Sequence, residues 1–356
     1  MNYKVKFKIN KVFNLDDYKV LNKDLTGVCE TNEDYLNHYK TKGVKEGRLI
    51  NKEQLKVNNE FGNECVLYIP YFYNLYKSGL LFDNVIETYQ GMQPYYVWCP
   101  NENIKFSNKE KRQWRKYILE NNPINWNSFS YNKLVYNEND HLNNFDKNYM
   151  ELFDYKDYYK KCEPIIKFDN DKPIVIVCNK ICKEWGLYPI NFYKVEELKR
   201  LFDLLLPKYN IIYSCNTPNI KDYSYDDNDI QELSKDFNEL EFLNEIEYEN
   251  VIVFETFIKL FKYDYNKTKL ITYAHCDDFI SVQGGNSYLV SYFFKNMFVL
   301  HKHGNERQEN LNVDTYYHWF MKMNNEENKK MFVEDNFEKL FEKIKENLIG
   351  AETITN

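Results

Sequence analysis

The sequence predicts an α/β protein whose second half folds around a parallel, doubly wound β-sheet. Apolar, β-branched runs recur there, and they are continuous rather than alternating, which is typical of strands buried on both faces of a sheet. Amphipathic helical patterns lie between the runs, and strands that alternate with helices indicate βαβ units. The runs are residues 174–178, 210–215, 250–255, 279–282 and 297–300.

The composition is that of an ordinary globular protein. Its 356 residues are 43% hydrophobic and 28% charged, and the length corresponds to about two domains of roughly 150 residues. The net charge is −7, without the basic run of a duplex-binding protein, so nucleic acid is not an expected partner. No apolar stretch approaches the roughly 18 residues of a membrane-spanning helix, and the N-terminus lacks the apolar core of a secretory signal. We therefore expect a cytoplasmic protein without a membrane span.

Residues 1–55 are expected to form a small helical appendage. Thr31 and Asp34 have the spacing of a capping box, and apolar residues at helical spacing follow them. Gly43 is placed to end that helix in a left-handed conformation.

Residues 56–165 are expected to form an N-terminal lobe. Gly62 and Asn63 stand before a long apolar stretch with helical spacing, which predicts a glycine turn that opens a helix and presents free backbone N–H groups. Two short strands are expected after this helix, at residues 85–89 and 94–99.

The remaining chain is divided into a C-terminal lobe at 166–325 and a final helical segment at 326–356. Before this lobe, residues 121–157 are Asn-rich and are expected to form an irregular loop or lid. Helices are expected between the strands of the lobe and after it. They are predicted at residues 195–206, 229–240, 257–261, 270–275, 286–294 and 332–348.

The clearest candidate for a binding site follows the fourth predicted strand of the C-terminal lobe. Gln283, Gly284 and Gly285 turn there, and Asn286 or Ser287 can cap the helix that follows. Paired glycines let a ligand approach the backbone, and a helix N-terminus supplies N–H donors and partial positive charge. The turn also follows the carboxyl end of a parallel strand, where open α/β sheets bind ligands. These features suit a phosphate, whereas the alternative is a tight strand-to-helix turn without a ligand.

A second candidate site follows the strand at 174–178. Asn179 and Lys180 leave that strand at the same end of the sheet, and a lysine there can neutralise a diphosphate as a point charge. Glu184 can accept hydrogen bonds from sugar or ribose hydroxyls. The alternative is a surface lysine and a solvated glutamate.

A metal centre is not expected. The eight cysteines are scattered without a C-x-x-C pair. Asp226 to Asp229 contain a D-x-D, but carboxylates in the first turn of a helix explain it. His301 and His303 alternate at the end of the last predicted strand and are further candidates for substrate contact. Without a nucleophile elbow, a P-loop or an H-E-x-x-H, hydrolase and kinase functions are disfavoured.

Five segments resemble glycosyltransferase-like proteins of the two-lobed GT-B type, which microbes and large DNA viruses encode. The segments are FGNECVLYIPYFYNLYKSGLLFDN, ETYQGMQPYY, NKICKEWGLYPINF, FISVQGGNSYLVSYFF and VDTYYHWFMKM. The NK-x-x-x-EWG and SVQGGNS motifs are their most specific parts, and the resemblance covers about residues 58–345. Separately, DYLNHYKTKGVKEGR resembles a short repeat found beside polysaccharide-assembling glycosyltransferases. The excess of residues with AT-rich codons is compatible with a large DNA virus.

The resemblance implies two Rossmann-type lobes that face a cleft. It also implies transfer of a hexosyl or deoxyhexosyl group from a nucleotide diphosphate sugar to a hydroxyl of a glycan or glycoprotein. Such proteins need no metal or other cofactor, because lysine and helix N-termini stabilise the departing diphosphate. By motif, Lys180 and the turn from Gly284 to Ser287 would face the diphosphate, and Glu184 would lie near nucleotide or sugar hydroxyls.

The resemblance places the general base near the glycine at the start of the N-terminal lobe. Related sequences often have an aspartate directly after that glycine, where this chain has Asn63. Asn63 cannot accept a proton, so Glu64 is the first candidate for the base and Asp83 the second. This departure supports an alternative hypothesis, a degenerate GT-B-like protein that binds a glycan or nucleotide as an assembly partner. A sugar-nucleotide epimerase would need several cleft carboxylates and histidines that the sequence does not place.

Overall fold

In the computed structural model the chain divides into two compact units. Unit 1 comprises Met1–Phe153 and Gln308–Met323, and unit 2 comprises Asp154–Arg307 and Asn324–Asn356. The predicted domain boundaries stay predictions. The residues that the structure describes are 13–43, 46, 48–50, 52–57, 61–107, 152–180, 191–215, 241–243, 248–302 and 329–350.

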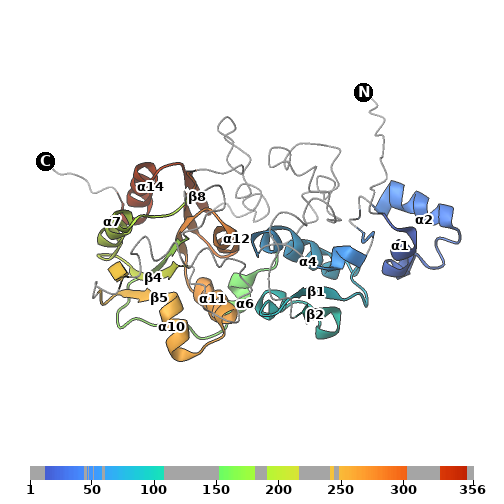
Figure 1. The fold of residues 1–356 in the computed structure, drawn as a ribbon, viewed down its shortest axis with the longest axis horizontal. Helices are drawn as coiled ribbons and strands as arrows, with labels where there is room; N and C mark the ends of the chain where they lie inside the picture. The colour runs from blue at the N-terminus through green and yellow to red at the C-terminus, as the bar shows by residue number, and fades with distance from the viewer. Residues whose placement is uncertain are drawn as a thin grey trace, which may run out of the picture. The chain divides into compact units, whose positions relative to one another are not determined.

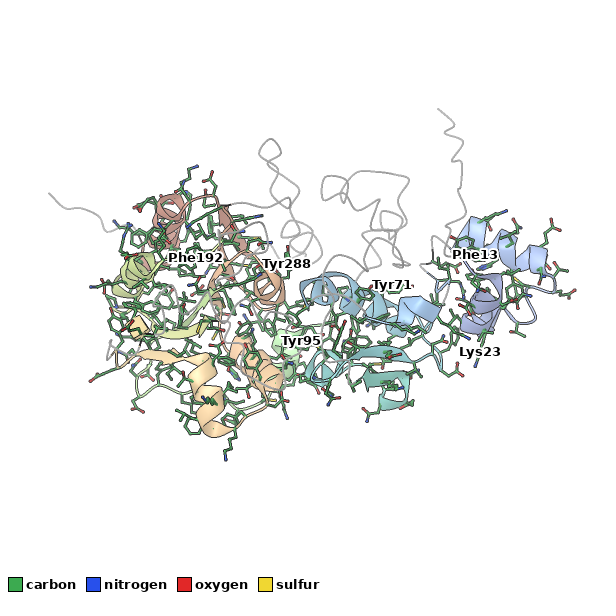
Figure 2. The ribbon with its side chains drawn as sticks, viewed as in Figure 1. Phe13, Lys23, Tyr71, Tyr95, Phe192 and Tyr288 are labelled. Carbon is green, nitrogen blue, oxygen red and sulfur yellow. The ribbon has the colours of Figure 1, made fainter. Side chains whose placement is uncertain are left out.

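Two short helices begin the described part of unit 1. Helix α1 (Leu15–Leu21) follows Asn14, whose side chain accepts hydrogen bonds from the first turn. Helix α2 (Asn32–His38) opens with the capping box of Thr31 and Asp34, which confirms that prediction. Figure 2 labels Phe13 and Lys23 in this region.

Gly43 was predicted to adopt a left-handed conformation at the end of the second helix, but the structure shows a different role for this glycine. It lies in the π-helical turn η2 (Tyr39–Gly43) and is not among the glycines with positive φ, so the predicted left-handed conformation is wrong. A Cβ atom at this position would lie 2.2 Å from the hydroxyl oxygen of Tyr18, a fully buried side chain that hydrogen bonds to Nδ1 of His38. Glycine is required because Tyr18 packs directly against the backbone.

One continuous helical segment carries the apolar stretch of unit 1. Helix α3 (Phe61–Asn63), the π-helical turn η4 (Glu64–Tyr68) and helix α4 (Ile69–Lys77) follow one another directly. Gly62 therefore lies in the first turn of this described segment and is itself helical, rather than part of a separate turn before the helix. The first N–H groups of a helix have no partner within it, and the residues before Phe61 lie outside the described ranges, so the expectation of free backbone N–H groups at this glycine stays a prediction.

A two-stranded parallel sheet follows the long helical segment. Strand β1 (Ile86–Tyr89) pairs with β2 (Ile104–Ser107). The first of these strands was predicted, but residues 94–99 are not a strand, since the 3-10 helix η5 (Gln93–Tyr96) begins there with Pro94 in its first turn. Tyr95 of η5 is labelled in Figure 2. The described residues of unit 1 leave the predicted Rossmann-type N-terminal lobe untested.

Unit 2 is built on a six-stranded parallel sheet, which confirms the predicted α/β class. All five predicted runs form strands, and a sixth strand follows them. The strands are β3 (Ile174–Asn179), β4 (Asn210–Cys215), β5 (Val251–Val253), β6 (Asp278–Val282), β7 (Asn296–Leu300) and β8 (Lys330–Glu334). Their order is β5-β4-β3-β6-β7-β8, with every neighbouring pair parallel. Counted from β3, this is the order 3-2-1-4-5-6 found in dinucleotide-binding Rossmann sheets.

Strand β8 occupies residues for which the sequence predicts the start of a helix. It pairs with β7 along the edge of the sheet, and helix α14 (Phe337–Ile344) begins only after Asn336, whose side chain caps it. The predicted start of the helix at residue 332 is therefore wrong. An edge strand of five residues is too short to show a distinct period.

Helices cover both faces of the six-stranded sheet (Figure 1). Helices α7 (Val195–Leu205) and α14 pack on one face, where they form a continuous apolar core with alternate residues of the strands. Helices α11 (Tyr265–Ala274) and α12 (Gly285–Val290) lie on the other face, where the ring of Tyr273 packs against a phenylalanine of β6. This layering is that of a doubly wound sheet.

Two further helices correct predicted boundaries. Helix α6 (Tyr155–Lys160) lies partly in the stretch 121–157 that was expected to be irregular, and most of that stretch lies outside the described residues. Helix α10 (Phe254–Phe261) begins where the run 250–255 was expected to continue as a strand. The predicted helix at 229–240 also lies outside the described residues.

Candidate functional site

The carboxyl ends of β3 and β6 meet where the strand order of the sheet reverses. Strand β3 pairs with β4 on one side and with β6 on the other, so the chain builds the sheet outward from β3 in both directions. Open α/β sheets bind ligands outside the carboxyl ends of the strands at such a switch point. Lys180 follows β3 and Gly284 follows β6, so the fold brings the two predicted binding segments together.

Lys180 and Gly284 lie directly against each other. A Cβ atom on Gly284 would be 3.0 Å from Nζ of Lys180 and 3.1 Å from its Cδ. Gly284 has φ +147° and ψ −175°, a conformation that is essentially restricted to glycine. The ammonium group of Lys180 therefore lies beside the glycine backbone. Lys180 is only 8% exposed, so its side chain has little access to bulk water.

Ser287 holds the conformation of the turn. Its Oγ donates to the carbonyl oxygen of Gly284 at 2.6 Å and accepts from the N–H of the same residue at 3.2 Å. Helix α12 begins at Gly285 and has six residues, fewer than the predicted helix at 286–294. A short helix contributes less partial charge than expected, so Lys180 is the main positive group of the turn.

Asn179 positions the segment that carries Lys180. Its Oδ1 accepts from the backbone N–H of Lys180 at 3.0 Å and from that of Tyr193 at 2.9 Å. Its Nδ2 donates to the carbonyl oxygen of Tyr193 at 3.0 Å. This side chain was predicted to bind the ligand, but its amide is directed to the backbone and joins the end of β3 to the segment before α7.

Gln283 and Asn286 are also held by partners within unit 2. Oε1 of Gln283 accepts from Nδ2 of Asn191 at 3.3 Å. Oδ1 of Asn286 accepts from the hydroxyl of Tyr273 at 3.0 Å, and this hydroxyl lies 3.5 Å from Sγ of Cys178. Asn191 lies in the NKICKEWGLYPINF segment, so the motif could have indicated it as a site residue. No motif in the sequence indicates Tyr273.

A buried charge cluster that the sequence did not indicate lies at the carboxyl end of β4. Glu255 accepts from Oγ of Ser214 at 2.7 Å and from the backbone N–H of Cys215 at 3.1 Å. The hydroxyl of Tyr265 donates to Glu255 at 3.3 Å and accepts from Nζ of Lys269 at 3.5 Å. Burial raises the pKa of Glu255, while the hydrogen bond from Ser214 and the charge of Lys269 oppose the rise.

Glu64, the first predicted general base, is completely buried in unit 1. Its Oε1 accepts from Oγ1 of Thr88 at 2.5 Å and from the hydroxyl of Tyr96 at 2.8 Å. These contacts join the long helical segment to β1 and η5, which is the arrangement of a structural carboxylate. A general base must reach the proton that it abstracts, and a fully buried carboxylate does not meet that condition.

Asp83, the second predicted base, is exposed and ion-paired. Its carboxylate lies 2.5 Å from Nζ of Lys23, and the hydrogen bond from this lysine lowers the pKa of Asp83. Nδ2 of Asn103 donates to the carbonyl oxygens of Phe82 and Asn84 and fixes the turn that carries Asp83. A lowered pKa makes a carboxylate a weaker base, so neither candidate has the environment that a general base requires.

Several predicted residues lie outside the described part of the chain. They are Glu184, the D-x-D at 226–229 and His303, and the side chain of Asn63 is likewise not described. His301 is buried directly after β7, where its backbone N–H donates to the backbone carbonyl oxygen of Glu334. Among the described residues, no group of three or more His, Cys, Asp and Glu could hold a metal ion. No helix in the same ranges is long and apolar enough to cross a membrane.

Comparisons of the chain with protein-family models, curated proteins and solved structures found no match.

Proposed function

We propose that the chain is a metal-independent glycosyltransferase of the GT-B type that acts in the cytoplasm. In this proposal unit 2 binds a nucleotide diphosphate sugar, and the sugar is transferred to a hydroxyl of a glycan or glycoprotein. The observation that carries the proposal is the contact of Lys180 with the Gly284 turn at the switch point of a parallel sheet. The strand order supports nucleotide binding, and the motifs that contain these two residues support a sugar donor.

The proposed chemistry uses Lys180 to stabilise the leaving group. As the bond from the sugar to the diphosphate breaks, negative charge develops on the departing nucleoside diphosphate. An ammonium group with little access to water interacts strongly with such charge. Gly284 lets the lysine side chain pack against the backbone of the turn because it has no side chain, and Ser287 keeps the turn in place. By motif, Glu184 is assigned to hydroxyls of the nucleotide or sugar.

Replacing Lys180 by alanine tests the donor site. Thermal unfolding is followed with a panel of nucleoside diphosphates and nucleotide sugars in the presence of EDTA. A ligand at 100 times its Kd stabilises the folded state by about 2.7 kcal/mol. We expect one nucleoside diphosphate to raise the melting temperature of the wild type and to have no effect on Lys180→Ala. Lys167→Ala, which changes a lysine with a side chain that is 68% exposed in the same unit, should keep the full shift.

A nucleotide shift that survives in Lys180→Ala would remove the assigned role of this lysine. If no compound of the panel stabilises the wild type, the donor site itself is rejected. These two outcomes separate an error in the residue from an error in the function.

A second function is favoured by the geometry of unit 1. Glu64 is buried among hydrogen-bond donors and Asp83 is ion-paired, so neither is set up to deprotonate an acceptor hydroxyl. A protein without a general base would bind a nucleotide or glycan without turnover. Its role would then be that of an assembly partner.

Product analysis separates the two functions. The chain is incubated with the nucleotide sugar that stabilises it and with glycan acceptors, and the mixture is analysed by mass spectrometry. A new glycoside supports the transferase, an unchanged donor supports the binding protein, and an isomerised donor would instead indicate an epimerase.

If a glycoside forms, Glu64→Gln tests the base assignment. A structural carboxylate predicts a loss of about 1 kcal/mol in the free energy of unfolding with turnover kept within about twofold. A general base predicts a loss of about 10²-fold or more in turnover. Thr88→Val removes a hydrogen bond to the same carboxylate without changing its charge, and it should show the same stability loss.

A further inference from the structure

Helix α10 ends in consecutive exposed apolar side chains. Leu260 is 72% exposed, Phe261 57% and Tyr263 45%. Single exposed apolar residues are ordinary on protein surfaces, but contiguous ones mark interaction sites. The rings of Phe257 and Phe261 lie 4.6 Å apart, and those of Phe261 and Tyr263 lie 6.0 Å apart and are stacked. We call residues 257–263 the α10 tip.

Lysines surround the α10 tip. Lys259, Lys262 and Lys267 are all exposed, and Lys262 ends the helix with a left-handed backbone at φ +55°. The one acidic residue among residues 257–267 is Asp264, whose side chain caps helix α11 by accepting from the N–H of Lys267 at 2.7 Å. The tip is therefore locally basic, although the whole chain has a net charge of −7.

The α10 tip could contact a second copy of the chain, another protein or a membrane, and its lysines favour one of these three. Two copies related by a two-fold axis would bring the same lysines into opposition, which disfavours self-association. Lysine is depleted in protein–protein interfaces, which disfavours a protein partner. Apolar and aromatic side chains bordered by lysines are typical of segments that lie at the surface of an anionic membrane.

We propose that the α10 tip docks the protein on an anionic lipid membrane. Leu260 and Phe261 enter the boundary between headgroups and acyl chains, where apolar side chains leave water. Tyr263 has an apolar ring with a polar hydroxyl and suits the headgroup level. The lysine ammonium groups bind lipid phosphates and carboxylates. Figure 1 shows α10 next to α11 at the rim of unit 2.

Co-sedimentation of the full chain with lipid vesicles tests this docking. We expect binding to phosphatidylcholine vesicles that contain phosphatidylserine, no binding to pure phosphatidylcholine, and release by salt because screening weakens surface charges. Lys259→Gln and Lys262→Gln should each lower vesicle partitioning about fivefold. The double variant Leu260→Ser, Phe261→Ser should lower it by about tenfold or more.

Two matched controls distinguish the tip from general surface effects. Val28→Ser removes an apolar side chain that is 73% exposed in unit 1, and Lys167→Gln removes an exposed lysine elsewhere in unit 2. Both should bind vesicles like the wild type. All of these side chains are exposed, so circular dichroism and melting temperature should be unchanged in every variant.

Absence of binding to the anionic vesicles at low salt overturns the proposal. Binding that the Leu260, Phe261 double variant retains also overturns it. Sedimentation without lipid tests self-association, and dimers that disappear in this variant would assign the tip to a second copy instead. None of these outcomes depends on whether Lys180 binds a nucleotide. The vesicle experiments therefore test the docking surface independently of the proposed function.

Discussion

Replacing Gly284 by alanine is expected to weaken nucleotide binding by about tenfold or more and to destabilise the protein. The new Cβ atom would lie 3.0 Å from Nζ of Lys180 and 3.1 Å from its Cδ, so it would displace the ammonium group that is proposed to bind the diphosphate. The backbone at φ +147° also disfavours any residue with a side chain, at a cost of about 1–3 kcal/mol. Urea denaturation measures the second effect, and isothermal titration with the stabilising nucleotide measures the first.

The neighbouring glycine is the matched control for this prediction. Gly285 is the first residue of α12 and does not have positive φ. Alanine reduces the conformational freedom of the unfolded chain, so Gly285→Ala should leave stability unchanged or raise it by about 0.4–1 kcal/mol. Equal effects of the two substitutions would show that the conformation and surroundings of Gly284 have no special role.

Replacing Lys269 by methionine is expected to cost about 3 kcal/mol in the free energy of unfolding at neutral pH. Lys269 is 1% exposed, and its charge is one of the interactions that oppose the rise in the pKa of Glu255. Removing one of two opposite buried charges leaves the other uncompensated, and for a direct ion pair this costs about 3–5 kcal/mol. The lower end applies because the hydroxyl of Tyr265 connects the two groups. Urea denaturation at pH 7 measures the loss.

This loss is expected to depend on pH with a defined sign. The pKa of Glu255 is raised in the folded protein, so the folded state retains a proton that the unfolded chain releases above about pH 4.3. Stability therefore falls as pH rises from there through the folded pKa. Lys269→Met removes a charge that restrains this pKa, so its deficit relative to the wild type is largest at neutral pH and shrinks toward pH 4.3.

An exposed lysine of the same helix provides the control for this pH dependence. Lys267→Met changes a side chain that is exposed on α11 and should alter the free energy of unfolding by less than about 0.5 kcal/mol at any of these pH values. A deficit of Lys269→Met that stays constant with pH would contradict the coupling of Lys269 to Glu255.

The sheet of unit 2 could be predicted because its central strands are buried on both faces. Short, continuous apolar runs such as residues 174–178 are typical of strands that are buried on both faces. In a parallel sheet the carboxyl ends of such strands all lie at one edge. That rule places Lys180 and Gly284 at the same edge of the sheet, and the pairing of β3 with β6, which the sequence did not predict, makes them neighbours. The edge strand β8 escaped prediction because it is short and half-buried, and α10 was obscured because it starts directly after a three-residue strand.

The partners of single side chains could not be predicted in the same way. Glu64 stands two positions after Gly62 in the sequence, yet it faces Thr88 and Tyr96 because the segment is one continuous helix. Glu255 and Lys269 come from different helices, and their proximity depends on how α10 and α11 pack. Sequence periodicity indicates which face of a helix is buried, but it does not indicate which residues of other elements contact that face.

The order of strands in unit 2 has a consequence for how the protein is made. Val175 of the central strand pairs with Ile211 early in the chain, but its partner on the other side, Asp278, is synthesised about a hundred residues later. During synthesis on the ribosome, β3, β4 and β5 can assemble first. One edge of β3 then has no strand to pair with until β6 has been synthesised. Distant pairings form slowly, and unpaired strand edges are prone to aggregation. Lys180 therefore meets Gly284 only late in synthesis, and the proposed donor site is incomplete in the nascent chain until most of unit 2 has emerged.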